Sequence, residues 1–219
     1  MASTYALELR LNGRKCLVVG GGEVAARKVR TLAQRGAVVH VVAPTIDASI
    51  RATPGVECHA QSYEPALLAG ATLVFACTDD AAVNRRVADD ARAAGAWVNV
   101  ADDPDNCDFL VPASLDRGDF RVTVSTAGAS PQLAATVRKQ LEASFGDEYA
   151  LLTEELRRAR PDVQKRIDDA ALRRAVFEAL CDDESIRLLK VGDVTGWRAR
   201  CERLIEYHRH PAGGGDREP

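Results

Sequence analysis

Long apolar runs are missing from this chain of 219 residues, and so is an excess of charge of one sign. No apolar stretch approaches the roughly 20 residues that a membrane-spanning helix needs. The opening residues MASTYALELRL contain no cationic segment followed by an apolar core, as a secretory leader would. We therefore expect a cytoplasmic protein without membrane contact. The 29 basic and 32 acidic side chains are spread evenly, so no basic face indicates nucleic acid as a partner.

The cysteines and histidines lack the spacing of metal ligands. The six cysteines contain no C-x-x-C pair, and Cys16 and Cys77 lie inside apolar strand patterns. We interpret the cysteines as small core residues rather than as disulfides or zinc ligands. The histidines are too dispersed for a metal site, although the last two of the chain could bind a metal adventitiously. They are His40, His59, His208 and His210. No metal site is expected.

A glycine turn between a strand pattern and a helix pattern organises the chain, in KCLVVGGGEVAARKVRTLAQR at 15–35. Cys16 to Val19 is a short apolar run, typical of a strand buried on both faces. In the pattern G-x-G-x-x-A, Gly20 permits a tight turn, Gly22 lets the backbone approach a pyrophosphate, and Ala25 lets the helix pack on the strand. We favour a dinucleotide site over a turn that serves packing alone, because the sequence shows both a strand pattern before the glycines and a helix pattern after them.

Further apolar runs alternate with helical patterns up to residue 100, which predicts a doubly wound parallel sheet of the α/β class. The runs lie at 37–42, 56–62, 71–77 and 96–100. Tyr5–Leu11 is expected to add an edge strand. The second strand ends at Ala43-Pro44-Thr45 without the acidic residue that commonly holds the ribose of NAD. The choice between NAD and NADP therefore stays open, with Arg51 as the nearest cation for a 2′-phosphate.

Ligands gather beyond the carboxyl ends of the strands in such a sheet. Three of these ends are GGG at 20–22, TDD at 78–80 and ADD at 101–103. Asp102 follows its strand directly, where a carboxylate at the edge of a cofactor crevice can act as a base. Asp105 and Asp108 in the same loop are interpreted as solvated turn residues.

The pattern changes after the first domain, which we place at 1–112. Two alternating strand patterns and one helix predict a small α+β region at 113–146. The helix follows a glycine turn, so its N-terminus is a candidate site for substrate carboxylates, and an ordinary capped helix is the alternative. The candidate residues are Ser125, Thr126, Gly128 and Ser130. Helical stripes then predict a helical domain at 147–210, with Pro161 ending one helix or opening the next, and a disordered tail at 211–219.

Several motifs occur in a recognisable order: VVGGGEVAARK, ACTDDAAVNRRV, VNVADDP and CDFLVPASLDRGDFRVTVSTAGASPQLA. With them the chain resembles the precorrin-2 dehydrogenase family of siroheme biosynthesis, which includes the N-terminal module of siroheme synthase. The resemblance implies a Rossmann NAD-binding domain, a dimerisation region and a helical domain. It also implies a homodimer that oxidises precorrin-2, a tetrapyrrole with eight carboxylates, to sirohydrochlorin with NAD.

Site residues carry over from the family position by position. Asp102 matches the family's essential aspartate. Ser125 and Thr126 fall on a serine pair of the tetrapyrrole site, with threonine in place of the second serine. The residues expected to bind the cofactor are Gly20, Gly21, Gly22, Glu23, Val24, Pro44 and Thr45, together with Thr78 and Asp79 at another strand end.

Two other functions stay open. Some relatives also insert ferrous iron into the product, so a bifunctional dehydrogenase and sirohydrochlorin ferrochelatase is one alternative, with ferrous or cobaltous ion as its second substrate. A non-catalytic module that senses NAD is an alternative of another class. Asp102 and the STAGASP turn favour an enzyme, because a sensor needs neither.

Overall fold

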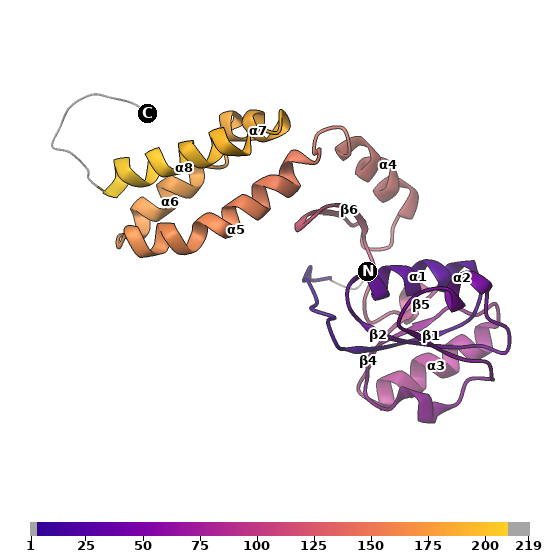
Figure 1. Cartoon of the computed structure of the whole chain (residues 1–219). Coiled ribbons are helices and arrows are strands. Elements are labelled where there is room, and N and C mark those ends of the chain that lie inside the picture. The colour runs from indigo at the N-terminus through magenta and orange to yellow at the C-terminus, as the bar shows by residue number, and fades with distance from the viewer. Residues whose placement is uncertain (1–3, 210–219) are drawn as a thin grey trace. The chain divides into compact units, whose positions relative to one another are not determined.

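The first part of the chain folds into a parallel sheet with helices on both faces (Figure 1). The computed structural model describes residues 4–209, which divide into a unit ending at Val111 and a unit beginning at Pro112. The strand order is β3-β2-β1-β4-β5. The strands are β1 (Lys15–Val19), β2 (Val38–Val42), β3 (Val56–His59), β4 (Ala71–Ala76) and β5 (Trp97–Val100). The predicted doubly wound α/β fold is confirmed.

Each face of this sheet has its own apolar core. Helices α1 (Glu23–Gln34) and α2 (Ala48–Arg51) cover one face, and α3 (Ala81–Ala93) covers the other with the short 3₁₀ turn η1 (Pro65–Leu68). Successive side chains of a strand point to opposite faces. Thus Val18 packs on the α1 side and Leu17 on the α3 side. Burial of both faces explains why the strands are continuous apolar runs.

The second unit begins with an antiparallel hairpin and continues as helices. The hairpin consists of β6 (Ala113–Arg117) and β7 (Phe120–Val124), and α4 (Pro131–Leu141) packs on both strands. Helices α5 (Glu148–Arg166), α6 (Ala170–Ala179), α7 (Asp183–Lys190) and α8 (Val194–Arg209) enclose a third core around Trp197. The finer division into 113–146 and 147–210 stays a prediction. The predicted tail at 211–219 lies outside the described residues.

The structure corrects two expected elements. Tyr5–Leu11 forms no strand: Tyr5 is 87% exposed, and the central strand β1 already pairs with β2 and β4. Pro161 does not end its helix, although a proline inside a helix costs roughly 3 kcal/mol. The helix continues because its last turns carry Val163 into the third core, where that side chain is fully buried.

Within residues 4–209, no helix is both long enough and apolar enough to cross a bilayer.

Candidate functional site

Three strand ends meet along one edge of the first unit's sheet. The chain reverses its direction of winding between β1 and β4, and this switch point is where doubly wound sheets bind ligands. Backbone bonds continue past the strands: Cys77 N–H donates to the Val19 carbonyl at 2.7 Å, and Ala101 N–H donates to the Ala76 carbonyl at 2.9 Å. The glycine turn, the TDD segment and Asp102 therefore follow neighbouring strands.

Two of the three glycines are required by close packing. Gly20 has φ +128°, and a Cβ there would lie 2.5 Å from the carbonyl oxygen of Cys77. A Cβ at Gly21 would overlap the carbonyl oxygen of Thr45. The Gly21 carbonyl also accepts a hydrogen bond from Asp47 N–H at 2.9 Å. These two positions hold the end of β1 against the ends of its neighbouring strands.

Gly22 has a different role, because a Cβ at this position would meet no atom within 4 Å. Gly22 is the N-cap of α1, and no side chain of the described residues caps this helix. By contrast, side chains cap the N-termini of α2, α3, α4, α6 and α7. Open space beside free N–H groups at a helix start is suited to an anion such as a pyrophosphate.

The end of β2 lies beside this turn. Pro44 and Thr45 are exposed there. Asp47 caps α2 and accepts hydrogen bonds from Ser49 N–H at 2.8 Å and from Ser49 Oγ at 2.6 Å. These bonds lower the pKa of Asp47, so a fixed carboxylate lies next to the glycine turn. The first turn of α1 contributes Glu23, which is exposed, and Val24, which is half-buried.

Thr78 is held by a buried asparagine that the sequence analysis did not identify. Asn84 is 7% exposed; its Oδ1 accepts from Thr78 N–H at 3.1 Å and from Thr78 Oγ at 2.7 Å, and its Nδ2 donates to the Thr78 carbonyl at 2.9 Å. Thr78 thus fixes the turn after β4, while Asp79 is exposed beside it. A polar residue on the otherwise apolar inner face of an amphipathic helix was the available signal.

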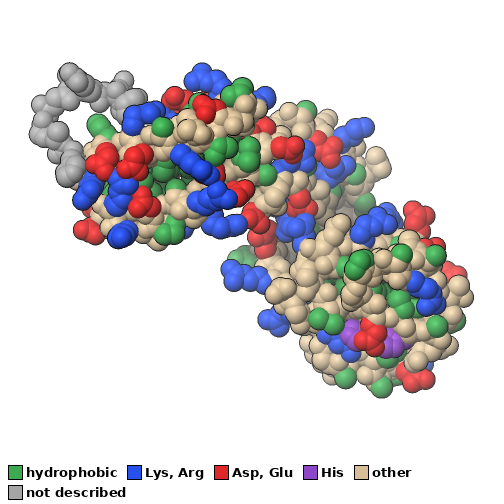
Figure 2. Space-filling view, viewed as in Figure 1, with side chains coloured by type: hydrophobic (Ala, Val, Ile, Leu, Met, Phe, Trp, Pro, Cys, Tyr) green, Lys and Arg blue, Asp and Glu red, His purple; other side chains and the backbone are tan. Residues whose placement is uncertain are grey.

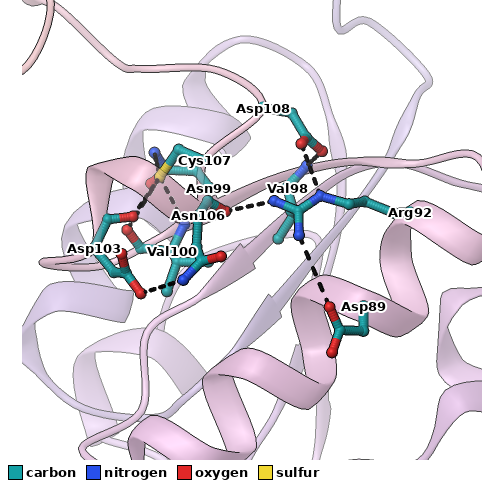
Figure 3. A network of polar contacts seen from close by, with 9 residues as sticks. All are labelled: Asp89, Arg92, Val98, Asn99, Val100, Asp103, Asn106, Cys107 and Asp108. Carbon is teal, nitrogen blue, oxygen red and sulfur yellow. Dashed lines mark hydrogen bonds and ion pairs between the residues drawn. The ribbon is translucent and has the colours of Figure 1, made fainter. Parts of the chain in front are cut away.

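The acidic loop after β5 is fixed by most of its polar side chains (Figure 3). Asp108 accepts from Arg92 Nε at 2.9 Å and from Val98 N–H at 3.0 Å, so it is not merely solvated. Asp103 accepts from Asn106 Nδ2 at 2.6 Å, within the 3₁₀ turn η2 (Pro104–Asn106). Cys107 Sγ accepts from Val100 N–H at 3.1 Å. Hydrogen bonds therefore fix the conformation of this loop.

Asp102 differs from Asp103 and Asp108, whose carboxylates are held within the loop. It is exposed and forms no hydrogen bond or ion pair within residues 4–209. Its φ is +60°, a left-handed conformation that few residues other than glycine adopt and that asparagine and aspartate tolerate best. Such backbone strain gathers at functional sites. The fixed loop thus presents the free carboxylate of Asp102 directly after β5, whereas the exposed Asp105 lies further along, in η2.

A second missed residue, Lys28, supplies a cation near this edge. Its Nζ lies 5.5 Å from the ring centroid of Phe75, and burial lowers its pKa below the ordinary value. The pKa of Cys77 is raised to about 11, mainly by burial; the positive charge of Lys28 opposes the rise, and the negative charge of Asp102 contributes to it. Lys28 and Asp102 therefore both lie within electrostatic reach of Cys77. A lysine on the core-facing side of α1 was the sequence signal.

The candidate substrate residues lie in the second unit, in the loop between β7 and α4. Ser125 Oγ accepts from Ala127 N–H at 3.2 Å, and Thr126 Oγ accepts from Ser130 N–H at 3.0 Å. Ser130 caps α4 by accepting from Leu133 N–H at 3.1 Å. Gly128 has φ +86°. The hydroxyl groups of Ser125 and Thr126 thus hold the loop while both act as acceptors.

Comparisons with known proteins agree with this arrangement. Residues 7–113 match a family described as putative NAD(P)-binding, and residues 117–144 match one described as sirohaem biosynthesis protein central. Siroheme synthase of Chromobacterium violaceum is 38% identical over 216 residues, covering 97% of this chain and 45% of that protein. Siroheme synthase of Nitrosomonas europaea is 41% identical over 176 residues, covering 78% and 37%. The solved structure of SirC, a precorrin-2 dehydrogenase, matches with a TM-score of 0.76 and 26% identity, covering 93% of this chain and 100% of that chain.

The chain thus resembles proteins of siroheme biosynthesis, among them siroheme synthases and the precorrin-2 dehydrogenase SirC. The resemblance indicated by its motifs is thereby confirmed, and the first unit carries a module for a nicotinamide cofactor. The chain spans less than half the length of the curated relatives described above. The roles of the individual site residues stay predictions.

The structure also corrects the interpretation of the histidines. His40 and His59 are not dispersed in space, because neighbouring strands bring them together with Glu57. The sequence does not show that His40 and His59 are close, because a parallel crossover connects β2 to β3 and separates them along the chain.

Proposed function

We propose that this chain oxidises precorrin-2 to sirohydrochlorin with NAD⁺ as the hydride acceptor. The likeness to SirC carries the proposal, because it extends over all of that dehydrogenase and over both units of this chain. The uncapped glycine turn after β1 and the free carboxylate of Asp102 after β5 support it, because they lie at the same edge of the sheet with only β4 between them. The family's siroheme synthases support the same pathway.

The first unit has the features that a dinucleotide requires. The backbone N–H groups of Glu23 and Val24, at the open start of α1, would hold the pyrophosphate. The exposed end of β2 at Pro44 and Thr45 would hold the adenosine ribose. Asp47 is fixed beside this end and would repel a 2′-phosphate, which favours NAD over NADP. When bound, the nicotinamide supplies a hydride acceptor.

The chain's own residues would handle the proton and the substrate's charge. Oxidation of precorrin-2 removes a hydride and a proton together. Asp102 offers an exposed carboxylate that no neighbouring group within the described residues engages, so we propose it as the proton acceptor. The loop from Ser125 to Ser130 lies at the start of α4 and would bind substrate carboxylates.

The decisive experiment compares Asp102→Asn with Asp105→Asn in an assay that follows NADH formation from NAD⁺ and precorrin-2. Asparagine keeps the left-handed backbone of residue 102 and removes only its basicity. We expect about a 100-fold fall in kcat for Asp102→Asn, with Asp105→Asn at wild-type rate. Normal turnover by Asp102→Asn would refute the role of the carboxylate. Absence of turnover in the wild-type chain, with NAD bound, would indicate the sensor instead.

The ferrochelatase alternative requires a separate arm of this assay. Sirohydrochlorin with ferrous or cobaltous ion replaces precorrin-2, and metal insertion is followed by absorbance. Insertion by the wild-type chain would make it bifunctional. If the chain forms NADH normally and inserts no metal, its activity is that of a dehydrogenase only.

We also propose that the chain is a homodimer. The hairpin of β6 and β7 packs on α4, and neither of its outer edges pairs with another strand within residues 4–209. Pairing of this hairpin with a second copy would complete the sheet. Light scattering during gel filtration should then give twice the chain mass of 23.6 kDa. A monomeric mass would contradict the proposal.

A further inference from the structure

Three polar side chains gather on one face of the sheet at its β3 edge. In the parallel register of β2 and β3, His40 is opposite Glu57, and His59 lies two residues further along β3. Residues two apart in a strand share a face. The alternate residues Val41 and Cys58 pack in the core on the opposite face. Figure 2 shows histidine side chains beside an acidic one at the surface of the first unit.

The donor atoms of these side chains are spaced like the ligands of a tetrahedral metal ion. His40 Nδ1 lies 3.3 Å from His59 Nε2, and the two oxygens of Glu57 lie 3.6 Å from His40 Nδ1 and 3.2 Å from His59 Nε2. Metal bonds of about 2.0–2.1 Å at tetrahedral angles place neighbouring ligand atoms about 3.3–3.4 Å apart. The separation of the two nitrogens therefore matches two neighbouring ligands of such an ion, and Glu57 presents one oxygen near each nitrogen.

A hydrogen-bonded cluster explains part of this arrangement. A proton shared between the two ring nitrogens satisfies the histidine pair, or a proton directed to Glu57 satisfies one histidine. Neither hydrogen bond requires the two nitrogens and the carboxylate to point to one place. A bound cation requires this, because it accepts a lone pair from each of the three groups.

The surroundings suit a site with one open position. The side chains of His40 and His59 are 18% and 24% exposed, whereas that of Glu57 is 61% exposed, so solvent reaches the cluster from one side. The ammonium group of Lys15, on the same face, donates to the carbonyls of Leu67 at 3.0 Å and Ala69 at 2.9 Å. These bonds direct its charge to carbonyl oxygens instead of to Glu57.

We propose that His40, Glu57 and His59 bind a divalent transition-metal ion of the zinc type, with water as the fourth ligand. Two imidazoles and one carboxylate are a ligand set that zinc and its neighbours favour. The site shares no residue with the predicted cofactor or substrate sites and does not depend on the proposed function. A metal there links the edge strand β3 to β2, so it stabilises the outer part of the sheet.

The test uses full-length, tag-free protein stripped of metal. Zn²⁺ binding is measured by calorimetry, and Co²⁺ binding by the visible absorption that distinguishes tetrahedral from octahedral cobalt. We expect one equivalent of either metal, a tetrahedral Co²⁺ spectrum, and a higher Tm with Zn²⁺. His59→Gln and His40→Gln should each weaken binding about 100-fold, and Glu57→Gln about 10-fold, since loss of a ligand costs at least as much as loss of an outer partner.

The double variant His208→Gln/His210→Gln is the matched control, because it removes the other two histidines of the chain. It should bind both metals as the wild type does. The proposed site is overturned if the double variant loses metal binding or if the Co²⁺ spectrum is octahedral. It is also overturned if His40→Gln and His59→Gln bind metal with unchanged affinity. Because Glu57 is exposed, Glu57→Gln should keep the fold, and unchanged affinity in this variant would remove the carboxylate from the ligand set. None of these measurements requires dehydrogenase activity.

Discussion

Gly22→Ala should separate cofactor binding from folding. A methyl group at residue 22 meets no atom within 4 Å, and the φ of −92° is accessible to alanine. The substitution weakens the N-cap by about 0.5 kcal/mol. It also removes about 0.4–1 kcal/mol of conformational entropy from the unfolded chain. These terms oppose each other, so the free energy of unfolding should change by less than about 1 kcal/mol.

Binding of NAD⁺ should respond quite differently. If the pyrophosphate lies against the start of α1, the new methyl group occupies the space through which the backbone approaches it. We expect Kd for NAD⁺ to rise at least about tenfold, equivalent to about 1.4 kcal/mol. Calorimetric titration with NAD⁺ gives Kd, and urea denaturation of the same samples gives stability.

Gly21→Ala is the contrasting variant. Its methyl group would overlap the Thr45 carbonyl oxygen, so the end of β2 must move and the unfolding free energy should fall by about 1–3 kcal/mol. The reasoning is refuted if Gly22→Ala binds NAD⁺ with wild-type affinity, because the pyrophosphate would then lie elsewhere. A Gly22→Ala variant as unstable as Gly21→Ala would refute the packing argument.

Three other predictions concern the residues that support the two units. Asn84→Ala leaves the backbone of Thr78 without its partner and should lower the unfolding free energy by about 1–3 kcal/mol in urea denaturation. Asp108→Asn should weaken its charged bond to Arg92 and cost about 1–2 kcal/mol, while hydrogen exchange in residues 101–108 becomes faster; unchanged exchange would contradict a fixed loop. Arg198 lowers the pKa of Glu155, so this pair's stabilisation is complete above the ordinary carboxyl value of 4.5 and is lost as pH falls through the lower folded value. Glu155→Gln should therefore lower the free energy of unfolding by about 2 kcal/mol at neutral pH, and the difference in stability from wild type should disappear in acid. A difference in stability that does not depend on pH would exclude the charge of Glu155 as its cause.

Local sequence determined the elements of the first unit. Apolar runs and helical spacing predicted its five parallel strands and its two longer helices. These patterns were predictive because the central strands are buried on both faces and each helix on one. The glycine turn was recognisable for the same reason, since strand, turn and helix are adjacent in the chain. In the second unit, the helix predicted after the glycine turn is α4, which begins at Pro131. Patterns of this kind depend on neighbours within a few residues.

Sequence alone did not predict where a favourable local signal would be overruled. Pro161 is a strong helix breaker, yet α5 continues because Val163 gains burial in a core formed by distant helices. The alternating residues at 5–11 suit a strand, but no strand of the sheet pairs with them. In both cases the deciding energy comes from packing partners that the local pattern does not contain.

The sequence by itself determined that a strand, a glycine turn and a helix follow one another, and that polar residues follow the strands. Only the tertiary structure decided that Gly21 is packed while Gly22 is open, that Asp102 is a free carboxylate on a left-handed backbone, and that His40 lies beside His59. The physical reason is strand register. Parallel pairing brings together side chains separated by a whole crossover, and this pairing is selected by the burial of both sheet faces at once.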